Sequence, residues 1–217
     1  MKNLQTAFIV IVRPQEEYEL KKIISLQPKN KKNKLEKHYP YPQKITALGV
    51  ADEGDNVFKQ YYPAVKTVVY DGRIFPFAEN TFNIGWSNAV LEHVGDEEQQ
   101  VVFLKEMHRT CKKLFFTTPN RYFLFELHTR FFLLHWLPKT VFDKILFLTS
   151  KSWATGDYMY LLSYKKLEKL LKKAGITNFK IYKNRFLGFT DELMDISKGV
   201  NIIDKMTLQD ILKAKKN

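Results

Sequence analysis

Two acidic residues follow two neighbouring apolar runs, and this arrangement suits the recognition of a nucleotide-like ligand. Asp52 follows the run 45–50, and Asp71 follows the run 67–70. One carboxylate can accept hydrogen bonds from ribose hydroxyls, while the other, or the backbone amide of Gly72, can read the edge of an adenine ring. Acidic residues are also common in surface turns, so a solvated turn is an equal alternative for the pair alone.

A small polar cluster follows a third apolar run. Residues 82–86 read as a buried strand, and the segment SNAVLEHV at 87–94 comes directly after it. Parallel strands that each end in small polar residues provide what a ligand crevice at their carboxyl ends requires.

The elements that would position these residues alternate between strands and helices. Apolar β-branched runs predict strands, and apolar residues spaced as on one helix face predict helices. The predicted strands are 45–50, 67–70, 82–86, 114–118 and 176–182, and the predicted helices are 96–113 and 164–174. This order favours an α/β fold with a mainly parallel sheet.

The two ends of the chain are harder to interpret. Residues 6–12 form an apolar run that fits either a buried strand or the first turns of a helix, since seven residues do not decide the period. The last thirty residues have a weak pattern, with 200–203 as a thin candidate for a final strand. A single domain is expected for 217 residues.

The net charge of +12 lies at the ends of the chain. Residues 1–44 carry ten basic and four acidic residues (+6), residues 45–142 carry ten and eleven (−1), and residues 143–217 carry fifteen and eight (+7). Such a surface can attract nucleic acid. Because the excess is mostly lysine without interleaved aromatic residues, a solvated lysine surface is the preferred interpretation.

The cysteine content and the most apolar stretch bear on where the protein is located. Cys111 is the only cysteine, which excludes an internal disulfide and fits a reducing compartment. The most apolar long stretch, residues 122–137, contains charged residues and is too polar to span a bilayer. We therefore expect a cytoplasmic protein without a membrane span, and we identify no metal site.

One string of motifs resembles a known family. It comprises ITALG at 45–49, DGR at 71–73, PF at 76–77, TFNI at 81–84, SNAVLEHV at 87–94 and TTPNR at 117–121. Together they resemble the class I S-adenosylmethionine-dependent methyltransferases, most closely the type 11 family, over residues 38–175. The resemblance implies a Rossmann-like fold, S-adenosyl-L-methionine as cofactor and a small-molecule methyl acceptor.

The resemblance also implies a cofactor site. Its residues would be Asp52, Asp71, Gly72, Asn88, Ala89, Val90 and His93. Asp71 would contact the adenine amine, with the Gly72 amide nearby. The residues from Asn88 to Val90 would line the methionine side, and His93 would close that wall. Asp52 would lie at or next to the ribose-binding acid, although Ala51 occupies the usual register.

The aromatic segment 122–160 resembles the substrate lid of this family. Asn120, Glu126 and His128 are the substrate candidates, with a solvated Glu126 and a packed His128 as alternatives. Because a sulfonium already makes its methyl group electrophilic, alignment of the acceptor can supply much of the rate, and a strong acid or base is not required. We therefore name no catalytic residue.

The ends depart from the family. The family's first strand ends in a glycine-rich turn, but the first glycine of this chain is Gly49, and residues 28–37 are a polar lysine-rich stretch. We expect one methyltransferase-like domain over 1–217, with atypical segments at 1–37 and 183–217 and a recognisable core at 38–182. Three functions stay open: methyl transfer, a non-catalytic methyltransferase-like protein, and a basic nucleic-acid-binding module.

Overall fold

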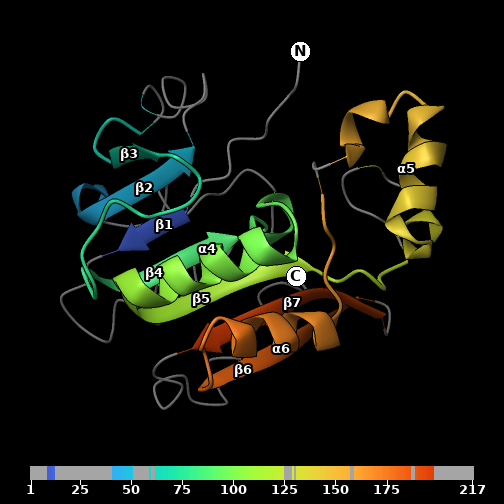
Figure 1. Cartoon of the computed structure of the whole chain (residues 1–217). Helices are drawn as coiled ribbons and strands as arrows, with labels where there is room; N and C mark the ends of the chain where they lie inside the picture. Colours follow the sequence, from blue (N-terminus) through green and yellow to red (C-terminus); the bar gives the residue numbers. More distant parts are fainter. Residues whose placement is uncertain are drawn as a thin grey trace.

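The structure is a computed structural model that describes residues 9–12, 41–50, 59, 62–124, 129, 131–156, 159–186 and 189–197. Its centre is a seven-stranded sheet in the order β3-β2-β1-β4-β5-β7-β6 (Figure 1). The strands are β1 Ile9–Val12, β2 Ile45–Val50, β3 Lys66–Tyr70, β4 Phe82–Asn88, β5 Cys111–Pro119, β6 Phe179–Phe186 and β7 Phe189–Ser197. The helices are η1 Pro42–Lys44, η2 Leu91–His93, α4 Glu97–Thr110, η3 Leu134–Trp136, α5 Lys139–Phe147, η4 Ser152–Ala154 and α6 Tyr164–Lys173.

Five of the seven strands point the same way, as the prediction of a mainly parallel sheet requires. β2 pairs with β3, and β4 with β5, in parallel. β7 pairs antiparallel with both β5 and β6, so β6 runs in the direction of β5. β1 is antiparallel to both of its neighbours, β2 and β4.

β1 fills the middle of the sheet, so the strand alternative for residues 6–12 is correct over Ile9–Val12. Its sequence, IVIV, consists of β-branched residues, which suit a strand with neighbours on both sides. The antiparallel register places Val12 beside Ile45, the first residue of β2, and beside Ile84, near the start of β4. The carboxyl end of β1 therefore lies at the edge of the sheet opposite the carboxyl ends of the parallel strands.

α4 begins with a capping box. Asp96 accepts hydrogen bonds from the backbone N–H of Glu98 and Gln99, and the Gln99 side chain accepts one from the Asp96 backbone. The predicted end at residue 113 is wrong. The backbone is already extended at Cys111, where β5 begins, because β5 pairs with Phe82 at that point.

The carboxyl-terminal part contains a strand that sequence reasoning missed. α6 begins at Tyr164, as predicted, and Ser163 caps it by accepting a hydrogen bond from the Lys166 N–H. β6 overlaps the predicted strand. β7 then inserts antiparallel between β5 and β6, although no final strand was expected near Phe189. Residues 200–203, the earlier candidate, lie outside the described residues.

α4 and α6 lie on one face of the sheet and form the main core with it (Figure 1). The described residues between β5 and α6, which we call the lid after the prediction, have a small core of their own, built from Phe142, Leu146, Ala154 and Met159. α5 of this lid lies beyond the carboxyl end of β5 (Figure 1). Within the described ranges, no helix is long and apolar enough to cross a bilayer.

Candidate functional site

The polar clusters predicted from the sequence meet along one edge of the sheet. Val50 is level with Tyr70 at the ends of β2 and β3, and Asn88 is level with Thr117 near the ends of β4 and β5. The turn after β3 and the Asn88 cluster therefore lie at the same edge, on either side of the position that β1 occupies.

Asp71 organises the turn after β3. Its Oδ1 accepts hydrogen bonds from the backbone N–H of Arg73 at 2.8 Å and of Ile74 at 3.2 Å. These two bonds, led by the one from Arg73, lower the pKa of the Asp71 carboxyl. The side chain is exposed, so a fixed and ionised carboxylate faces solvent at this edge.

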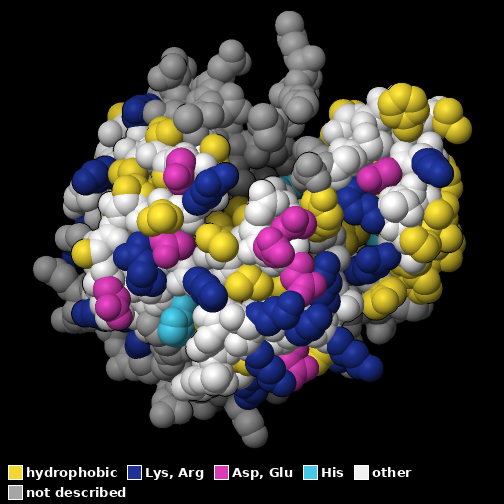
Figure 2. Space-filling view, viewed as in Figure 1, with side chains coloured by type: hydrophobic (Ala, Val, Ile, Leu, Met, Phe, Trp, Pro, Cys, Tyr) yellow, Lys and Arg dark blue, Asp and Glu magenta, His cyan; other side chains and the backbone are white. Residues whose placement is uncertain are grey.

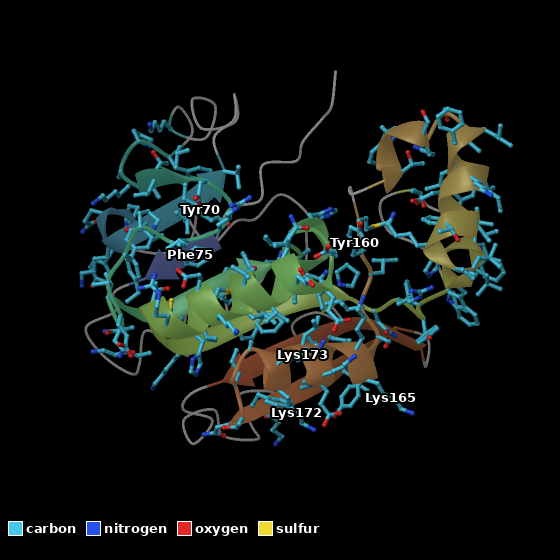
Figure 3. The ribbon with its side chains drawn as sticks, viewed as in Figure 1. Tyr70, Phe75, Tyr160, Lys165, Lys172 and Lys173 are labelled. Carbon is cyan, nitrogen blue, oxygen red and sulfur yellow. The ribbon has the colours of Figure 1, made fainter. Side chains whose placement is uncertain are left out.

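Tyr70, the residue before this turn, packs against the loop that follows it. Its ring meets the Phe75 ring edge to face with 5.2 Å between centroids, and Figure 3 labels both residues. Burial, followed by the neighbouring Asp71 charge, raises the pKa of the Tyr70 phenol to about 12. Tyr70 therefore stays neutral, and Asp71 is the negative group here.

Gly72 presents a bare backbone next to this carboxylate. Its φ of +82° is a left-handed conformation that only glycine adopts without strain. A Cβ at this position would lie 3.8 Å from Val50 Cγ2, and Val50 is 52% exposed although it is apolar. An exposed apolar side chain beside a bare backbone and a fixed carboxylate suits a planar heterocycle carrying an amine.

An ion pair on α4 clamps the loop that carries this turn. Arg109 donates to Glu106 through Nε and Nη2, at 2.9 and 2.6 Å. Arg109 also donates to the carbonyls of Phe77 and Phe75 at 2.7 and 3.0 Å, and Glu106 accepts from the Phe75 N–H at 2.9 Å. The Arg109 bond lowers the pKa of Glu106. Sequence reasoning missed this clamp because its partners lie more than thirty residues apart.

The Asn88 cluster turns sharply away from the sheet. Ala89 has a φ of +52°, one of three positive values at non-glycine residues in the described chain. Its N–H donates to the Thr117 carbonyl at 3.0 Å, and Thr117 Oγ1 donates to Asn88 Oδ1 at 2.7 Å. The strained turn is held by β5 and leaves the Asn88 side chain exposed while Val90 is buried.

η2 links this wall to the lid. Glu92 is buried and accepts from Thr118 Oγ1 at 3.0 Å, and its Oε1 lies 3.9 Å from His93 Nε2. The Glu92 carbonyl accepts from the Tyr160 N–H at 2.7 Å, and Gln100 Nε2 donates to the Tyr160 carbonyl at 3.3 Å. Tyr160, labelled in Figure 3, lies where the lid returns to the sheet. His93 therefore lies on η2 directly after the buried Glu92, and its predicted place in the cofactor wall stays a prediction.

The remaining predicted residues are placed only in part. Asn120 lies at the base of the lid, where it pairs with Leu162 and the Arg121 N–H donates to the Leu162 carbonyl. Asp52, Glu126 and His128 lie outside the described residues. In the described part of the chain, no group of three His, Cys, Asp or Glu side chains could hold a metal ion.

The fold and the motif both resemble one class of protein. The fold is the Rossmann-like fold of class I S-adenosylmethionine-dependent methyltransferases. Residues 33–114, from before β2 into β5, match the model of a family described as "Methyltransferase domain". The resemblance predicted from the motif string is thereby confirmed.

Solved structures are similar over most of the chain. An S-adenosylmethionine-dependent methyltransferase from Methanosarcina mazei has a TM-score of 0.51 at 14% identity, covering 70% of this chain and 81% of that one. A methyltransferase of the same cofactor dependence from Thermotoga maritima has a TM-score of 0.49 at 14% identity, covering 70% and 72%. No curated protein matches the chain.

The described residues fit S-adenosylmethionine on two sides. The Asp71 carboxylate beside the bare backbone of Gly72 would suit the adenine amine, and the exposed Asn88 side chain would border the methionine. The glycine-rich turn that would follow a parallel first strand has no counterpart at this edge in the described residues, since β1 runs the other way.

Proposed function

We propose that the chain transfers a methyl group from S-adenosylmethionine to a small-molecule acceptor. The observation that carries the proposal is the convergence at one edge of the fixed Asp71 carboxylate, the bare backbone of Gly72 and the strained turn after Asn88. The family match over residues 33–114 covers all three.

In this proposal the chain binds and orients, and does little acid–base chemistry. Asp71 accepts from the adenine amine, and Val50 packs against the ring. Asn88 to Val90 border the methionine side, and His93 closes that wall. The cofactor supplies a methyl group on a positively charged sulfur, which needs alignment with the acceptor rather than activation. The lid covers the acceptor side.

Calorimetry with S-adenosylmethionine and with S-adenosylhomocysteine tests the proposal. We expect both ligands to bind the wild type, and Asp71→Asn to weaken both by about tenfold, the loss of one charge-assisted hydrogen bond. Glu79→Gln removes a carboxylate from the same exposed loop and is the matched control. Absence of heat and of any thermal shift at millimolar ligand would remove the proposal.

The reversed β1 favours a second candidate, a methyltransferase-like protein without cofactor binding. In this candidate the missing turn deprives the ribose and the methionine carboxylate of backbone donors. Strong binding by the wild type would count against it. No binding by the wild type, together with a folded protein by circular dichroism, would favour it over the first.

Nucleic-acid binding stays a prediction with less support. The lysines of α6, three of which are labelled in Figure 3, are partly engaged: Lys172 pairs with Glu168 at 2.7 Å, and Lys169 and Lys173 pair with Glu97 of α4. Salt-dependent retardation of RNA or DNA would support this function.

A further inference from the structure

The lid helix α5 is apolar on both of its faces. Its inner side buries Phe142 and Leu146 in the lid core. Its outer side carries Val141, half-buried Ile145, Phe147 and Leu148, of which Phe147 is 71% and Leu148 85% exposed. We call these four residues the α5 patch. A group of exposed apolar side chains of this kind is expected to mark an interaction surface.

Positive charge surrounds the α5 patch. Lys144 lies on the same outer side, between Val141 and Leu148 in the helical repeat, and is exposed. Lys151 follows α5, with its Nζ 5.9 Å from the centre of the Trp153 ring, and Trp153 is 44% exposed. Three lysines and one aspartate between residues 139 and 153 give a local charge of +2. Figure 2 shows apolar and basic side chains adjoining on the right-hand side, over α5.

We propose that the α5 patch docks on the surface of an anionic lipid bilayer. Exposed Phe and Leu can enter the boundary between headgroups and acyl chains, Trp side chains favour that same boundary, and lysines attract acidic headgroups. The net charge of +12 on the whole chain adds a longer-range attraction to such a surface.

A second copy of the chain is a poorer occupant. A two-fold interface brings each patch against itself, so that the +2 charge of one lid meets the +2 charge of the other. An anionic surface has no such conflict. This inference goes beyond the proposed function, because lipid docking does not depend on cofactor binding, and either can fail alone.

Flotation with lipid vesicles tests the inference on the full chain. We expect the protein to float with vesicles made of equal parts phosphatidylcholine and phosphatidylglycerol, and to stay behind with pure phosphatidylcholine. Phe147→Ser with Leu148→Ser should lower the bound fraction by at least about tenfold. Val102→Ser, a change at a 41% exposed apolar residue of α4, should leave it unchanged.

A charge reversal isolates the lysines. Lys144→Glu with Lys151→Glu should weaken binding by about tenfold or more, whereas Lys105→Glu with Lys112→Glu, an equal change in net charge elsewhere, should have little effect. Equal losses in the two pairs, or equal flotation of the wild type and the Phe147/Leu148 variant, would overturn the inference. The inference would also be overturned if sedimentation showed a dimer of the wild type and a monomer of the Phe147/Leu148 variant.

Discussion

Three of the four glycines that have a positive φ in the described residues differ in what surrounds them. At Gly72 a Cβ would meet only Val50 at 3.8 Å, and at Gly156 it would meet nothing within 4 Å. At Gly95, with φ +123°, it would lie 2.0 Å from Gln99 Oε1, the atom that completes the capping box of α4. The first two positions need glycine for its conformation, and the third also needs it for space.

Alanine substitutions should follow that order. We expect Gly72→Ala and Gly156→Ala to lower the free energy of unfolding by about 1–2 kcal/mol each, the cost of left-handed backbone. Gly95→Ala should lower it by about 2–3 kcal/mol, because the capping box is lost as well. Urea denaturation measures all three. A Gly95→Ala loss no larger than that of Gly156→Ala would contradict the steric account.

The Gly72 substitution should also have an effect on binding. The added methyl group would lie beside Val50, where the adenine is proposed to bind. The affinity for S-adenosylhomocysteine should therefore fall in Gly72→Ala, while Gly156→Ala keeps the wild-type affinity. Calorimetry separates the two variants at similar stability. Equal affinities would place the ligand away from Gly72.

At the scale of elements, α4 determines the position of the loop after β3. The side chains of Arg109 and Glu106 take part in five hydrogen bonds, three of them to the backbone of Phe75 and Phe77. The pair is partly buried, with side chains 34% and 13% exposed. The pair therefore contributes more to the position of the loop than an ion pair on the solvated surface would.

Removal of this clamp should lower both stability and affinity. We expect Arg109→Met to lower the free energy of unfolding by about 1.5–3 kcal/mol, since hydrogen bonds to a charged donor are lost and two carbonyls lose a partner. Lys105→Met, on an exposed position of the same helix, is the control. If stability falls without any change in ligand affinity, the clamp does not position the Asp71 turn.

The direction of β1 has a direct signature. In antiparallel pairs, opposite residues bring their Hα atoms close together, which parallel pairs do not. We expect Hα–Hα nuclear Overhauser effects between β1 and both neighbours, at alternate members of the pairs Ile9–Leu48 to Val12–Ile45 and Ile9–Ser87 to Val12–Ile84. Their absence in a labelled sample would contradict the reversed strand.

Local patterns predicted the elements well where apolar runs were uninterrupted. β2, β3, β4 and the start of α6 lie where expected. β7 was missed because Asp191, Glu192 and Asp195 interrupt its apolar residues, and because only pairing with β5 and β6 makes it a strand. The direction of β1 could not be predicted, since IVIV has the same period in both directions.

The candidate site also has a part that the sequence predicts and a part that it does not. Asp71 and Asn88 stand directly after predicted strands, so their meeting at one edge follows from parallel pairing. The partners that fix them come from elsewhere: Thr117 lies on the next strand and Tyr160 at the end of the lid. Such contacts depend on packing between elements and have no local signal.

At the scale of the whole molecule, Glu97 joins the two described helices on the sheet face. Lys173 donates to its Oε1, and Lys169 Nζ lies 3.6 Å from the same atom. The Lys173 bond, before any other cause, lowers the pKa of Glu97. A carboxyl whose pKa is lower in the folded state contributes stability above its unfolded pKa and loses it as the pH falls through the folded value.

Acid unfolding should reflect this pair. We expect Glu97→Gln to lower Tm at pH 7 and to leave a smaller difference from the wild type at pH 3, because protonation of the Glu97 carboxyl weakens its pairing with Lys173 as the pH falls. Glu98→Gln, at the exposed neighbouring position, is the control. A Tm difference that is the same at both pH values would show that the pairing with α6 adds nothing. High salt should reduce the difference at pH 7.

The central place of β1 has a consequence for how the chain folds. In the described sheet, β2 and β3 reach β4 and β5 only through four residues near the amino terminus, which pair with residues more than seventy positions later. Closing so long a loop is slow, and each parallel pair can form before it. We expect the amides of β2 and β3 to exchange with deuterium as one cooperative unit, at a lower opening free energy than those of β4 and β5. A nascent chain would then carry two half-sheets that unite late, and any short β-branched segment able to enter that slot could compete with Ile9–Val12 for it.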